Sequence, residues 1–177
     1  MNDDVKEKER VVSDPSLGAG GPPTKQTILV QVVATRDWDD GVGFQLKWEH
    51  PKGVWHSGPM VFPKDDIDRE LAYDLVDETG LDLVFDSKAD DCIWVTTAPC
   101  PKHTKPPKGS DKGQIKNKVR AGNRKLTLEN LNDTHPYKLH YALRFTGKPY
   151  QNAEGEKFGP TYSYDPEYRN NGGGGNV

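Results

Sequence analysis

KLHYALRF, residues 138–145, alternates apolar and polar side chains with a period of two. Successive side chains of an extended strand point to opposite faces, so one face of this stretch is apolar and the other polar. The apolar set consists of Leu139, Tyr141, Leu143 and Phe145. This pattern is typical of a half-buried strand in an antiparallel sheet.

Other stretches repeat this pattern. FQLKWE, residues 44–49, places Phe44, Leu46 and Trp48 on one face. QTILVQVVAT, residues 26–35, is more continuously apolar and predicts a central strand. Further strands are expected at DCIWVTT, GQIKNKV, KLTLENL and TYSYD. Eight or nine short strands separated by turn residues predict an all-β protein, an antiparallel β-sandwich with an immunoglobulin-like arrangement.

Residues 66–78 fit two interpretations. As a helix, Ile67, Leu71 and Leu75 form one stripe, but three acidic residues lie near the negative end of the helix dipole. As a strand, residues 71–76 alternate and lead through the turn DETG into LDLVF, which makes a β-hairpin. We favour the hairpin.

The chain of 177 residues has the length of one domain. Residues 1–24 combine charges with DPSLGAGGPP and are expected to be a disordered N-terminal arm. Residues 25–168 form the predicted β-sandwich domain, and residues 169–177 a flexible glycine-rich tail. The organisation is therefore one folded unit between two mobile ends.

Composition restricts the compartment. Mean hydropathy is −0.86, no apolar run approaches membrane length, and the first residues lack the apolar core of a secretion signal. Two cysteines are too few for a disulfide scaffold. We expect a cytoplasmic protein with no membrane association. Whether Cys92 and Cys100 pair is left open.

Two segments resemble a known group. DETGLDLVF with CIWV and CP at 77–101, and YALRF with YSYDPEYRNNGG at 141–173, resemble small bacterial all-β proteins of no known activity, which end in an aromatic, Asp-Pro and Asn-Gly-rich tail. The resemblance implies a β fold and a bacterial origin. It brings no activity or site residues with it.

Charge is unevenly distributed. Residues 101–125 carry nine lysines and arginines against one aspartate, whereas residues 65–91 carry eleven acidic residues against two basic ones. The basic stretch predicts a long solvated loop, a docking surface for the acidic segment of another copy, or a phosphate or nucleic-acid site. It contains no aromatic residue to stack on bases. The binding residues under this hypothesis are Lys102, Lys105, Lys108, Lys112, Lys116, Lys118, Arg120, Arg124 and Lys125.

Metal binding is a further alternative. Cys100 and His103 have the spacing of a ligand pair, but a structural zinc site needs four ligands and no second pair is evident. We therefore assign no metal site and no cofactor, and keep these two residues as weak alternatives.

Catalytic patterns are absent from the sequence. His56 and Ser57 are adjacent and would point to opposite faces of a strand, and no nucleophile elbow occurs. The sequence therefore indicates no enzyme. Ile93 and Val95 are expected in the core, which turns Trp94 outward as a contact residue or places it under a loop. The favoured function is a non-catalytic β-sandwich acting through protein contacts, with another protein or with itself.

Overall fold

The computed structural model describes residues 25–37, 41–58, 60–62, 67–98, 104–132, 137–164 and 167–170. Almost every element in these ranges is a strand, and the one helix is α1 (Ala89–Cys92). The prediction of an all-β protein is confirmed. Among the described residues no helix has the length and apolarity to span a membrane.

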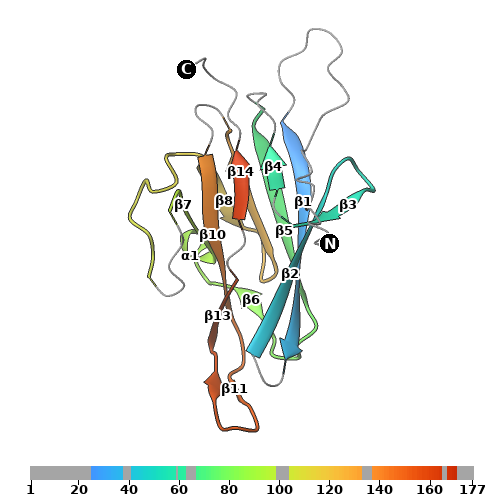
Figure 1. The fold of residues 1–177 in the computed structure, drawn as a ribbon, viewed down its shortest axis with the longest axis vertical. Coiled ribbons are helices and arrows are strands. Elements are labelled where there is room, and N and C mark those ends of the chain that lie inside the picture. The colour runs from blue at the N-terminus through green and yellow to red at the C-terminus, as the bar shows by residue number, and fades with distance from the viewer. Residues whose placement is uncertain are drawn as a thin grey trace, which may run out of the picture.

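The first sheet has six strands. Its order is β3 (Trp55–Ser57), β2 (Gly41–Glu49), β1 (Gln26–Asp37), β5 (Arg69–Asp77), β9 (Lys125–Asn130) and β8 (Ile115–Arg120). Of these strands, β3, β2 and β1 lie on the right-hand side in Figure 1. The apolar strand β1 is third of six, so its predicted central position is confirmed. Residues 69–77 are a strand and not a helix.

The second sheet is built around β10 (Tyr137–Thr146). Leu143 pairs with both Ile93 and Tyr164, so β10 has neighbours on both sides. One side carries β6 (Val84–Phe85) and β7 (Ile93–Thr96). The other carries β13 (Thr161–Tyr164) and β14 (Glu167–Asn170), with β4 (Met60–Phe62) beyond β14. A small hairpin of β11 (Tyr150–Gln151) and β12 (Lys157–Phe158) projects from one end (Figure 1).

The core lies between the two sheets. The predicted inward set of β10 is fully buried, and so are Ile28, Val30 and Val32 of β1. Aromatic rings connect the sheets, with Phe44 stacked on Phe145 at a centroid distance of 5.1 Å. Burying such side chains stabilises the fold by roughly 1.5–3 kcal/mol each. The period-two alternation therefore correctly predicted which side chains of β10 belong to the core between the sheets.

Three parts of the predicted architecture are not confirmed. The described residues contain strands β1 to β14 and not eight or nine. β1 pairs with β5 in parallel, as β14 does with β4, which departs from the predicted antiparallel, immunoglobulin-like arrangement. β14 also runs through residue 170, two residues into the segment assigned to the tail.

The predicted hairpin across DETG is wrong. β5 ends at Asp77, and the chain then crosses to the second sheet, where β6 pairs with β10 instead of returning along β5. Leu81, Leu83 and Phe85 are buried in the common core on the way. Because these apolar residues can be buried against either sheet, alternation alone did not identify their partner strand.

Candidate functional site

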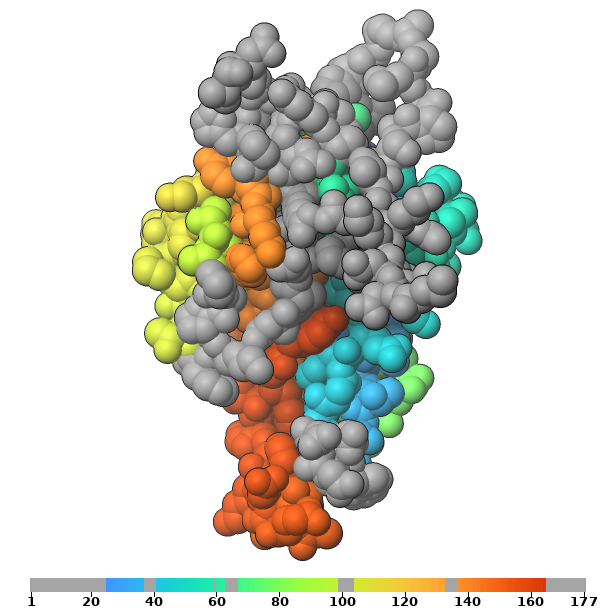
Figure 2. All heavy atoms as spheres, viewed as in Figure 1, coloured from blue at the N-terminus to red at the C-terminus, as the bar shows by residue number. Residues whose placement is uncertain are grey.

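The basic stretch is not one loop. Residues 104–114 lie outside any strand, but the chain then forms the hairpin of β8 and β9. Five of the nine predicted binding residues belong to this hairpin, namely Lys116, Lys118 and Arg120 on β8, Arg124 in the turn, and Lys125 on β9. The part of the segment that precedes β8 lies on one lateral side of the molecule, shown in yellow in Figure 2. The predicted loop is therefore correct only for its first part.

Three cations of this hairpin bind the free edge of the second sheet. Lys118 Nζ donates to the Ile93 carbonyl at 3.3 Å, an Arg120 guanidinium nitrogen to the Phe85 carbonyl at 3.4 Å, and Arg124 Nε to the Leu83 carbonyl at 3.2 Å. These carbonyls belong to or border β6 and β7. We call Lys118, Arg120 and Arg124 the cation seal, because they link the hairpin of the first sheet to backbone carbonyls of the second.

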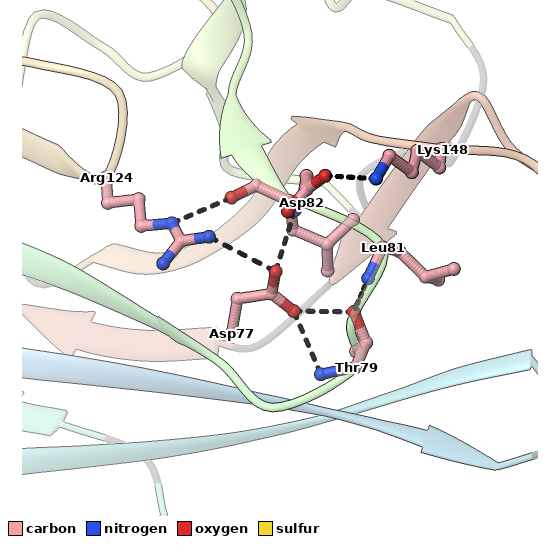
Figure 3. A network of polar contacts seen from close by, with 7 residues as sticks. Asp77, Thr79, Leu81, Asp82, Arg124 and Lys148 are labelled. Atoms are coloured by element: carbon pink, nitrogen blue, oxygen red, sulfur yellow. Dashed lines mark hydrogen bonds and ion pairs between the residues drawn. The ribbon is translucent and has the colours of Figure 1, made fainter.

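Arg124 also contacts the acidic segment. Its guanidinium lies 3.3 Å from Asp77 Oδ2, which accepts a hydrogen bond from the Leu83 backbone as well (Figure 3). Asp77 Oδ1 accepts from the Thr79 hydroxyl and backbone N–H. Partial burial alone would raise the pKa of Asp77, but these hydrogen bonds and the Arg124 charge outweigh it and lower the pKa below its ordinary value.

A second pair, Lys105 with Asp91, joins the basic and acidic segments. Its hydrogen bond holds the pKa of Asp91 below the ordinary value. The opposite charges that suggested docking between copies thus meet, in these two pairs, within one chain. Of the remaining predicted residues, Lys116 lies opposite Glu129 and Lys125 opposite Asp74 in the sheet. Lys108 and Lys112 are exposed, and Lys102 lies outside the described residues.

A pocket of about 810 Å³ lies beside this segment, between β7 and β8. Its wall combines apolar groups such as Trp94 and Pro107 with the side chains of Lys108, Lys116 and Lys118. Asp90 and Asp111 also line it, which reduces its net positive charge. Burial of the Lys118 ammonium lowers its pKa, and the two aspartates only partly oppose this.

Trp94 faces away from the core, as predicted, because Ile93 and Val95 belong to the core cluster. However, its side chain is covered: the residue is only 8% exposed. The Arg144 guanidinium lies 3.9 Å from the centroid of its rings. Trp94 therefore lies under other groups of the chain and is not an exposed anchor.

The metal hypothesis concerns Cys100 and His103, and both residues lie outside the described residues. Within the described ranges, no group of three or more histidine, cysteine or acidic side chains could hold an ion. Cys92 is a buried free thiol that donates to the Asp86 carbonyl at 3.1 Å. Burial raises its pKa to about 11, which disfavours the thiolate that metals bind.

An exposed apolar surface lies elsewhere, on the outer face of the six-stranded sheet. Four large apolar residues are strongly exposed among the described residues: Leu29 at 46%, Val54 at 45%, Trp55 at 46% and Val119 at 52%. Three of them occupy one line perpendicular to the strands, and Val54 adjoins Trp55. The line has one residue per strand, in the order Trp55, Glu49, Leu29, Ala72, Thr127 and Val119. We call it the outer row.

The sequence of β1 does contain a signal for the outer row. Continuous apolar sequence in QTILVQVVAT means that both faces of the strand are apolar. Ile28, Val30 and Val32 account for the core face, so Leu29 and Val33 must lie on the other. Trp55 and Val119 carry no comparable signal, because each stands in a short or polar stretch.

No protein-family model matches the chain, and no curated protein matches it either. The functional assignment therefore depends on the geometry of these surfaces.

Proposed function

We propose that this protein is a non-catalytic β-sandwich protein that acts through protein contacts, made by the outer face of its six-stranded sheet. The observation that carries the proposal is the outer row. Single exposed apolar residues are ordinary on a protein surface. Here three of them lie along one line, spaced by Glu49, Ala72 and Thr127, and we take this alignment as the mark of an interaction site. The proposal does not require an immunoglobulin-like arrangement. It requires only an open sheet with one face toward solvent.

Composition of the row supports a protein partner. Exposed tryptophan and leucine provide large apolar contacts, and tryptophan in particular is enriched among residues that dominate interface energies. Glu49 holds the turn before β3, since its carboxylate accepts a hydrogen bond from the Gly53 backbone at 2.6 Å. Trp55 is thus presented from a short strand whose preceding turn is held in place.

A capture experiment tests this function. Three baits are immobilised: the natural chain, the Leu29→Asp variant, and a variant with Lys108 and Lys112 replaced by Glu. Each is exposed to lysate of the cells that make the protein. We expect Leu29→Asp to lose the proteins that the natural chain captures, while the lysine variant keeps them. Equal capture by all three baits would contradict the proposal.

A second candidate function is binding of a phosphate-bearing ligand at the pocket between β7 and β8. The observation favouring it is the presence of Lys108, Lys116 and Lys118 around one hollow. Titration with inorganic phosphate and with single-stranded DNA at ~50 mM salt tests it, because phosphate contacts weaken steeply as salt rises. Absence of binding at that salt concentration removes this candidate.

A further inference from the structure

The two central strands of the six-stranded sheet place apolar residues side by side on their outer face. β1 and β5 are parallel, and on their outer face Leu29 lies beside Ala72 and Val33 beside Val76. None of these four residues belongs to the core cluster. Parallel pairs are usually covered on both faces, and their sequences are correspondingly apolar. Here the outer face carries these four apolar residues between polar ones such as Gln31 and Asp74, and it is exposed at Leu29.

The size of this face suits a dimer interface. Six strands ~4.8 Å apart span about 24 Å. β2 and β5 are each nine residues long, and nine residues of strand extend about 30 Å. The face thus measures about 700 Å², close to the ~800 Å² per partner of a standard specific interface.

The charges on the face balance among the strand residues whose side chains the structure describes, together with Lys25 directly before β1. Its cations are Lys25, Lys47, Lys116 and Lys125. Its carboxylates are Glu49, Glu70, Asp74 and Glu129. Lys25 lies 3.4 Å from Glu70 and also bonds Glu129, so part of this charge is paired within the chain. A neutral face neither repels a second copy nor attracts a highly charged partner.

The outer row is also complementary to itself. Its midpoint lies between Leu29 and Ala72, on the third and fourth of six strands. A two-fold axis through that point and parallel to the strands would set Leu29 against Ala72, Trp55 against Val119, and the Glu49 carboxylate against the Thr127 hydroxyl. Two of these pairs match a larger side chain with a smaller one, and the third matches an acceptor with a donor. Self-complementarity of this kind is what a symmetric dimer requires.

We infer that the outer face of the six-stranded sheet is an interface between two copies of this chain, packed face to face about the centre of the outer row. The inference rests on the proposed function and names its partner. Residues 1–24 of the same chain offer few apolar side chains with which to cover the face instead. The one unfavourable juxtaposition is Lys47 against Lys125, on the second and fifth strands and two residues from the outer row.

Sedimentation equilibrium of the full chain tests the inference. We expect a reversible dimer whose dissociation constant rises about tenfold or more when Leu29 and Val119 are both replaced by Thr, since removing interface anchors acts on this scale. Gln45→Thr, on the same face but off the row, is the matched control and should leave the constant unchanged. Lys47→Glu should tighten the dimer, because it places a carboxylate against Lys125.

Cross-linking locates the contact. In a Cys100→Ser background, Ala72→Cys at the row centre should cross-link between copies with a short bis-maleimide, whereas Lys138→Cys on the second sheet should not. A chain that stays monomeric at ~100 μM, a dimer unaffected by the row variants, or dimerisation only after removal of residues 1–24 would each overturn the inference. The proposed function is measured separately, by the capture experiment. If the chain proved monomeric but Leu29→Asp still abolished capture of other proteins, the proposed function would stand and only the dimer would be excluded. If Leu29→Asp did not abolish capture, the proposed function would fail as well.

Discussion

Trp94 and Trp55 lie on the outer faces of the two different sheets, and they differ in what covers them. Trp94, on β7, is 8% exposed and has the Arg144 guanidinium over its rings. Trp55, on β3, is 46% exposed. A tryptophan is thus covered by its own chain on one sheet and is accessible to a partner on the other. Facing away from the core does not by itself make a residue a binding residue.

The largest expected difference is in stability. Trp94→Ala should lower the free energy of unfolding by about 3 kcal/mol, since it removes a buried aromatic side chain. Trp55→Ala should change it by less than about 0.5 kcal/mol, as most surface substitutions do. Urea unfolding of both variants, at a concentration where the chain is monomeric, measures this. Equal losses would remove the distinction between the two residues.

Substitution of Asp77 measures how strongly the end of β5 is bonded to the segment that leads into the second sheet. In Asp77→Asn the amide nitrogen would face donors, either Leu83 N–H and Arg124 or the Thr79 groups, so we expect a loss of about 2–3 kcal/mol at neutral pH. The lowered pKa of Asp77 in the folded chain stabilises the protein above the ordinary carboxyl pKa, and this contribution is lost as pH falls through the lowered value.

Urea unfolding from pH 7 down to pH 2 measures the effect. The stability difference between the natural chain and Asp77→Asn should shrink as the pH falls, and Thr79→Val is a related control that removes only the hydroxyl bond. A difference that does not vary with pH would show that the Asp77 charge does not contribute.

Arg144 tests what covers Trp94. Arg144→Ala should cost about 1 kcal/mol, from the lost cation–π contact and the lost packing of the aliphatic stem. Arg144→Lys keeps the charge and should recover part of the loss. Unfolding curves, together with quenching of tryptophan fluorescence by acrylamide, measure both effects. Unchanged quenching in Arg144→Ala would mean that other groups cover Trp94.

The smallest expected effect is at Leu29. Leu29→Thr should alter the stability of the monomer by less than about 0.5 kcal/mol, because the residue is exposed and threonine suits a strand. Unfolding of a dilute sample measures this. A loss above about 1.5 kcal/mol would mean that Leu29 is packed within its own chain, which would weaken the case for an open face.

Local pattern predicted most of the core and few of the pairings. The inward residues of β10 and of β2 follow from alternation, which depends only on neighbouring residues. The parallel pairing of β1 with β5 joins segments about forty residues apart, and no local signal specifies which strand joins which. For the same reason the chain after Asp77 was assigned to a hairpin, whereas it crosses to the second sheet.

The candidate site was predicted less well. Clustering of lysines and arginines in the sequence suggested one binding surface, but the alternating directions of side chains on β8 and β9 separate them. Lys118, Arg120 and Arg124 form the cation seal, while Lys116 and Lys125 lie opposite acidic residues. Trp55 was missed because exposure depends on what the folded chain places over a residue, which composition does not reveal.

The central position of β1 has a consequence for synthesis of the chain. Among the described strands β1 leaves the ribosome first, and its neighbour β2 follows directly, but its other neighbour β5 ends only at Asp77 and the rest of the sheet is complete only at Asn130. At about 5–20 residues per second, β1 therefore waits for several seconds with one of its two neighbours missing. Translation speed and chaperone capture in that interval should therefore influence how much of the protein reaches its native form.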